Sequence, residues 1–198
     1  MRQLTFIVGL AVAVTGCAPS SPASPSYVVP LTVTQVRTGE PLSSAVTLVH
    51  PGEPLSSTHL KGEHETPPHD TLAQGQSVMT VSADGQSISF KLMASNIDNV
   101  VASHIHVGPI GSPGPVVVFL YGNAAAGGGR HNGILAEGEF GAANLVGPLA
   151  GQPLSALLAQ MDAGNTYVNV HTNDGVAPTN TGPGDFASGE IRGQIVRK

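Results

Sequence analysis

Short runs of alternating apolar and polar residues dominate the chain and predict β-strands. In SISFKLMA, at 87–94, every second residue is apolar, so the segment has one apolar and one polar face. Asp84-Gly85 stands between this run and SVMTV at 77–81, which is a strong hairpin signal. Further predicted strands lie at 100–107, 116–121, 133–140, 166–172 and 189–196.

One segment has a different period and predicts a helix within 152–165. Pro153 suits its first turn, and Gly164 followed by Asn165 is a stop signal. The apolar residues that recur at the spacing of one helical face are Leu154, Leu157, Leu158 and Met161. Many short strands with one short helix predict an all-β fold, namely an antiparallel Greek-key β-sandwich or barrel-like domain.

Composition agrees with this fold class and narrows the range of partners. Glycine and proline are frequent, with 25 and 16 residues among 198, and only 11% of the residues are charged. The formal net charge is −5, and no basic cluster is present that could follow a phosphate backbone. We therefore expect no nucleic-acid partner.

The N-terminus carries the pattern of an export signal. Arg2 precedes an apolar run at 4–14, and small residues then lead to Cys17, the only cysteine. The ending VTGC resembles the bacterial lipobox, which implies cleavage after residues 1–16 and lipidation of Cys17. Ala18 in place of aspartate resembles an outer-membrane sorting signal. The resemblance implies a lipid-anchored protein of the bacterial cell envelope, and the alternative is an ordinary signal peptide or membrane anchor.

The rest of the chain divides into three parts. Residues 17–28 are small, polar and rich in proline, as expected of a tether that leads away from the lipid. Residues 29–57 form an N-terminal extension in which two short strands are predicted, and the sequence does not determine how the extension packs. Residues 58–197 contain the main domain.

Four segments of this domain occur in the order of a known family. They are GEHETPP at 62–68, ASHIHVGPIGSPGPVVVFL at 102–120, LSALLAQMDAGNTYVNVHT at 154–172 and GEIRGQI at 189–195. Together they resemble the CHRD domain, which is named after chordin, and the resemblance covers most of the chain after the tether. It implies an extracellular all-β module and does not bring a settled activity.

Histidines on two predicted strands are the main candidates for chemistry. His104 and His106 are two positions apart and therefore share one strand face, and His171 lies on the strand at 166–172. Their apolar neighbours point to the opposite face, so the three imidazoles are expected on the outward face of the sheet. If the two strands are neighbours, the histidines can hold copper or, as the alternative, zinc. His131, in a glycine-rich stretch, is a further candidate ligand.

Side chains that hydrogen-bond a metal-bound imidazole fix its tautomer, and strand faces suggest Asn169, Glu190 and Arg192 for this role. The competing interpretation is that the histidines are structural and bind the GPIGSPG loop at 108–114, which leaves a module that interacts with a protein or a glycan. The sequence contains no G-x-S-x-G, H-E-x-x-H or phosphate-loop motif, and no catalytic residues are predicted. A copper redox enzyme remains a third interpretation, which requires a substrate pocket.

A second group of histidines lies in the loop around 59–70. His59, His64 and His69 are spaced five residues apart, with acidic residues between them. The group offers a loose metal site, but Pro67-Pro68 prevents a regular face, and we interpret the segment as a solvated loop.

Overall fold

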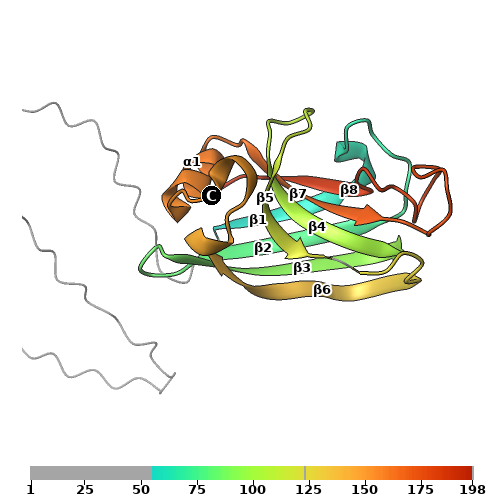
Figure 1. Ribbon diagram of the computed structural model, residues 1–198, viewed down its shortest axis with the longest axis horizontal. Helices are drawn as coiled ribbons and strands as arrows, with labels where there is room; N and C mark the ends of the chain where they lie inside the picture. Colours follow the sequence, from blue (N-terminus) through green and yellow to red (C-terminus); the bar gives the residue numbers. More distant parts are fainter. Residues whose placement is uncertain (1–54, 123, 198) are drawn as a thin grey trace, which may run out of the picture. The chain divides into compact units, whose positions relative to one another are not determined.

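The computed structural model describes residues 55–122 and 124–197, which form an antiparallel β domain with one α-helix (Figure 1). The predicted signal and lipidation site at 1–17, the tether and most of the extension up to residue 57 lie outside the described residues. The strands are β1 (Ser56–Lys61), β2 (Gln74–Val81), β3 (Ser87–Asp98), β4 (Val100–Val107), β5 (Val116–Tyr121), β6 (Arg130–Gly141), β7 (Thr166–Thr172) and β8 (Ile191–Ile195). The helices are α1 (Leu154–Asp162) and the 3-10 turns η1 (Gly62–His64), η2 (Ala142–Asn144) and η3 (Gly147–Leu149).

All eight strands belong to one sheet, in the order β5-β4-β7-β8-β1-β2-β3-β6. Every neighbouring pair is antiparallel. The end strands β5 and β6 also contact each other, so the sheet curls into a nearly closed barrel. The predicted all-β antiparallel class is confirmed, and of the two architectures that the sequence left open the structure has the barrel-like one.

The barrel interior is the hydrophobic core. On β3 the residues at 88, 92 and 94 are buried, as the alternating pattern predicted, and the hairpin to β2 closes at Gly85, whose φ of 69° suits glycine. On the site side of the barrel, Ile105, Val168 and Val170 also point inward and are fully buried. Burial of these side chains fixes which face of β4 and β7 is left for the histidines.

The predicted helix and its core residues are also confirmed. Leu154, Leu157 and Met161 of α1 are buried in the same core, and the helix covers one end of the strands. Gly164, with a φ of 68°, follows the helix as predicted. The long connection between β7 and β8 lies at the opposite end from α1 (Figure 1). Within 55–122 and 124–197, no helix is long and apolar enough to cross a membrane.

One strand was not predicted. β1 begins at Ser56, two residues before the predicted start of the domain, and pairs with β2 along its whole length. Its buried face carries Ser56, Thr58 and Leu60, so two of its three inward residues are polar. The hydroxyl of Thr58 donates a hydrogen bond to the carbonyl oxygen of Gln194 on β8 at 3.1 Å. This polar inward face explains why the hydrophobic pattern did not show the strand.

Candidate metal centre

Neighbouring strands bring the three predicted histidines together. β4 pairs with β7 in a register that places His104 opposite Asn169 and Ala102 opposite His171. His104, His106 and His171 each offer one ring nitrogen, and these three nitrogens lie within 4.8 Å of one another. Within the described ranges, this is the one group of three or more metal-ligating side chains with such a spacing.

The rings converge but do not lie on an exposed surface. The centroid of the His104 ring is 4.9 Å from that of His171 and 5.6 Å from that of His106. The expected outward orientation is correct in that the rings point away from the barrel core. The rings are shielded there, since His106 is only 7% exposed and the other two are partly buried. The loop that follows β4 and the connection that follows β7 fold over this face and shield it.

Backbone carbonyls fix the tautomers of two of the rings. Nδ1 of His106 lies 2.8 Å from the carbonyl oxygen of Gly114, and Nδ1 of His171 lies 3.0 Å from that of Ala187. A carbonyl oxygen only accepts, so each Nδ1 carries the hydrogen and donates it. Each Nε2 therefore keeps a free lone pair, which is the form that binds a metal. The predicted hydrogen bond from the histidines to the loop at 108–114 is confirmed for His106.

The two free lone pairs have different surroundings. Nε2 of His171 lies 3.2 Å from Nδ1 of His104, which donates a hydrogen bond to it. Nε2 of His106 is buried and makes no hydrogen bond of regular geometry among the described residues, and the side chain of Asn169 is a polar neighbour of this ring. A buried lone pair needs a partner. The amide of Asn169 or a bound cation could provide one.

The electrostatic environment keeps all three imidazoles neutral. Burial, together with the neighbouring His171 and His106, lowers the pKa of His104 to about 4. Burial is also the main cause that lowers the pKa of His106 and the pKa of His171, against the raising effect of their carbonyl partners. At neutral pH the site therefore offers three uncharged nitrogen donors.

A stack of side chains supports His106 from behind. The Tyr167 ring is stacked on the His106 ring with the centroids 4.8 Å apart and the planes at 8°. The guanidinium carbon of Arg192 lies 3.4 Å from the centre of the Tyr167 ring. The Tyr167 hydroxyl accepts a hydrogen bond from the Gly114 N–H at 3.1 Å, so the stack also holds the residue whose carbonyl orients His106. Alternation along β7 placed Tyr167 on this face, but the sequence did not indicate its role.

The three residues that were expected to fix the imidazoles have different roles. Asn169 is buried beside His106 and raises the pKa of that ring, as expected of a neighbour that favours the protonated form. Arg192 donates to the carbonyl oxygens of Ser112 and Pro109, each at 3.0 Å, so its hydrogen bonds hold the loop rather than an imidazole. The carbonyls of Gly114 and Ala187 take the place that was predicted for side chains.

Among the described residues, Glu190 makes no hydrogen bond to any of the three rings. Its carboxylate accepts hydrogen bonds from the hydroxyls of Thr71 and Thr172 at 2.6 and 2.7 Å, and from the N–H of Gly184 at 2.9 Å. It therefore joins β7 to the connection that carries Ala187. This role requires a sheet register that strand faces alone do not reveal.

The remaining candidate histidines lie elsewhere. His131 is on β6, opposite Ile97 of β3, and is not part of the group on β4 and β7. His69 stacks on Phe186 with the ring centroids 3.8 Å apart, and burial lowers its pKa. His59 is exposed on β1, and His64 lies in η1. The loose metal site around 59–70 does not form a group of metal-ligating side chains in the structure.

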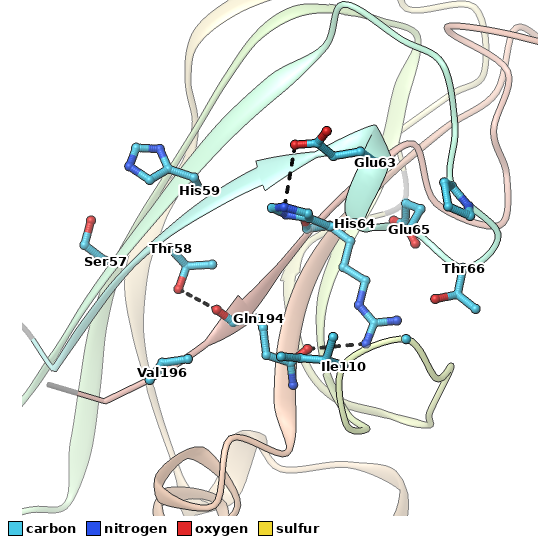
Figure 2. A pocket seen from close by; sticks show the side chains of 13 residues that line it. Ser57, Thr58, His59, Glu63, His64, Glu65, Thr66, Ile110, Gln194 and Val196 are labelled. Atoms are coloured by element: carbon cyan, nitrogen blue, oxygen red, sulfur yellow. Dashed lines mark hydrogen bonds and ion pairs between the residues drawn. The ribbon is translucent and has the colours of Figure 1, made fainter.

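A cavity of about 640 Å³ lies next to the stack and was not predicted. Arg192 and Gln194 of β8 line it together with Thr58 of β1. Figure 2 shows Glu63 and His64 on one side of this cavity and Ile110 on the other. The exposed side chains of Ile110 and Val196 form apolar parts of its rim.

The comparisons with known proteins agree with the resemblance seen in the sequence. The family model described as CHRD domain matches residues 56–195. No curated protein and no solved structure matches the chain. The matched region includes all eight strands, the histidine group and the residues that orient it. Because the match spans well over half of the sequence, the chain belongs to the CHRD domain family.

Proposed function

We propose that this domain binds one transition-metal ion, copper before zinc, through His104, His106 and His171. The observation that carries the proposal is the convergence of three ring nitrogens within 4.8 Å of one another, in a group that includes the buried His106. Nε2 of His171 and Nδ1 of His104 are the other two donors, because these atoms lie 3.2 Å apart, and the hydrogen of His104 moves from Nδ1 to Nε2 when the ion binds.

The chemistry of the donors supports this choice of metal. Neutral imidazole suits copper and zinc, whereas hard cations such as Mg²⁺ and Ca²⁺ prefer oxygen ligands. For the same nitrogen donors, divalent copper binds more tightly than zinc. Two of the three tautomers are already set by carbonyls, so the chain does not have to reorganise these rings when the ion binds.

The function in the cell follows from the site and from the N-terminus. We propose that the protein holds or delivers the metal in the bacterial cell envelope, attached to the membrane through a lipid on Cys17, with the outer membrane as its location. The apolar run at 4–14, which ends in VTGC, supports the anchor. The family supports an extracellular setting.

The proposal is tested by measuring metal in the full chain. Every sample carries Cys17→Ser, so that no thiol binds the metal. After loading with copper or zinc and removal of loose ions, we expect one ion per chain. We expect His106→Ala to lose the ion and His131→Ala, the matched control on β6, to keep it. Equal metal content in the His106→Ala variant and the parent chain would refute the proposal.

A specific observation also favours a second function, an interaction module with structural histidines. His106 and His171 hold the carbonyls of Gly114 and Ala187, and through them the two segments that cover the face. On this alternative, His106→Ala lowers the free energy of unfolding of metal-free protein, and neither copper nor zinc raises that of the parent chain. Under the metal-binding proposal, copper stabilises the parent chain and leaves His106→Ala unchanged.

A further inference from the structure

Arg192 is a buried cation that the proposed metal site does not use as a ligand. Its side chain is 2% exposed, and its guanidinium carbon lies 3.4 Å from the centre of the Tyr167 ring. The opposite face of that ring is stacked on His106 at 4.8 Å. The positive charge is therefore fixed directly behind one of the three rings that face the site.

The charge of Arg192 is not neutralised by a close ion pair. Its guanidinium donates to the carbonyl oxygens of Ser112 and Pro109 at 3.0 Å and to Oε1 of Gln194 at 3.4 Å, and all three acceptors are uncharged. Among the described residues, no carboxylate lies within 4.0 Å of it. Glu65 is the acidic group whose charge acts on Arg192. The field of the guanidinium thus reaches the His106 ring.

The donors of the metal site provide no compensating negative charge. The group contains three histidines and no carboxylate or cysteine. A divalent ion in this site brings two positive charges next to the Arg192 charge, whereas a monovalent ion brings one. Repulsion between like charges at short range in a partly buried region is only weakly screened.

From this arrangement we infer that Arg192 makes the site selective for monovalent copper, Cu(I), over Cu(II) and Zn(II). The inference rests on the proposed metal site and specifies which ion that site takes. Arg192 acts here through its charge and contacts no metal-binding nitrogen, so it is a positioning and selectivity residue rather than a ligand. Soft ligands are the usual source of Cu(I) selectivity, and this site would reach it by charge instead.

The size of the effect follows from Coulomb's law. Two unit charges roughly 10 Å apart, at an effective dielectric constant of about 20, change an equilibrium about tenfold. Removal of the Arg192 charge should therefore lower the ratio of the Cu(I) to the Cu(II) binding constant about tenfold. For a one-electron couple, that change equals a fall of about 59 mV in the reduction potential of the bound copper.

The experiment compares this ratio between variants of the full chain, all with Cys17→Ser. Cu(I) is titrated without oxygen against a coloured Cu(I) chelator, and Cu(II) and Zn(II) against chelators of their own. We expect Arg192→Met to lower the ratio about tenfold, while Arg192→Lys, which keeps the charge, retains most of it. Arg130→Met is the matched control, because Arg130 lies on β6 and its removal takes away the same charge. An unchanged ratio in Arg192→Met, or an equal fall in Arg192→Lys, overturns the inference.

A second variant tests the same charge effect from the opposite side and does not depend on the folding of the Arg192 variants. Glu65→Gln at pH 8 removes the negative charge that acts on Arg192, so the ratio should rise; a ratio that falls or stays constant overturns the inference. A parent chain that binds neither copper nor zinc overturns the proposed function together with this inference. A parent chain that binds copper with no preference for Cu(I) overturns this inference alone.

Discussion

Glu65 gives the sharpest prediction for stability, because it is a buried carboxyl group beside the stack. Its side chain is 7% exposed, its Oε1 makes no hydrogen bond of regular geometry among the described residues, and the Thr66 N–H and the Asn169 side chain are its polar neighbours. Burial raises the pKa of Glu65 from 4.5 to about 7, although the charge of Arg192 acts in the opposite direction. In the unfolded chain the group returns to its ordinary pKa near 4.5.

The sign and the magnitude follow from proton linkage. Between pH 4.5 and pH 7 the folded chain binds more protons at Glu65 than the unfolded chain does, so this group lowers stability as the pH rises. Above pH 7 the cost is complete. The difference between the pKa values of Glu65 in the folded and the unfolded chain corresponds to about 3 kcal/mol in the free energy of unfolding, at 1.36 kcal/mol for each pKa unit. Glu65→Gln removes the ionisation and therefore this dependence.

The assay is urea unfolding of the parent chain and of Glu65→Gln from pH 4.5 to pH 8, followed by circular dichroism in the presence of a metal chelator. The histidines have lowered pKa values and act in the opposite direction below pH 6.5, so only the difference between the two chains isolates Glu65. We expect the variant to gain about 3 kcal/mol relative to the parent chain over this range. Glu139→Gln, at an exposed position on β6, is the control. Parallel curves for parent and Glu65→Gln would refute the reasoning.

Three further predictions follow from particular contacts. Gly114→Ala should weaken copper binding at least about tenfold in a chelator competition, because a Cβ at this position would overlap the carbonyl oxygen of Val107 and displace the carbonyl that orients His106. Leu157→Ala should lower the free energy of unfolding by about 2–5 kcal/mol, because this fully buried side chain fills the core under α1; a loss under about 1 kcal/mol in urea unfolding would contradict that packing. Cys17→Ser should move the exported protein from the membrane fraction to the soluble fraction, and continued membrane attachment would contradict the lipid anchor.

The sequence predicted the parts of the fold that depend on local patterns. Alternation over 87–94 identified the inward face of β3, and the spacing of Leu154, Leu157 and Met161 identified α1 and its buried side. β1 was not identified, because Ser56 and Thr58 occupy inward positions where an apolar residue is the usual signal. Their hydroxyls are tolerated inside because partners are available, such as the carbonyl oxygen of Gln194 for Thr58.

For the candidate site too, the sequence predicted the features that depend on one strand and did not predict the contacts between distant segments. Period-two alternation placed His104 with His106, and it placed Tyr167 and Asn169 on the face of His171, because side-chain direction along one strand is a local property. Arg192 reaches Tyr167 only because β8 pairs with β7 so that Asn169 lies opposite Arg192. That register is set by burial across the whole barrel. The hydrogen bonds of Glu190 could not be predicted for the same reason, since its partner Thr71 is distant in sequence.

The loop at 108–114 determines whether an outward strand face becomes a site. Without it, His106 would face water, and no carbonyl would fix which of its two ring nitrogens carries the hydrogen. Gly114 provides a carbonyl to His106 and an N–H to Tyr167, while Arg192 holds the same loop through Ser112. The loop at 108–114 therefore shields the His106 ring, fixes which of its nitrogens carries the hydrogen, and holds the Arg192 guanidinium on the far side of the Tyr167 ring. Because these effects share their contacts, a substitution in the loop should change metal affinity more than it changes the stability of the barrel, whose core lies on the other side of the sheet.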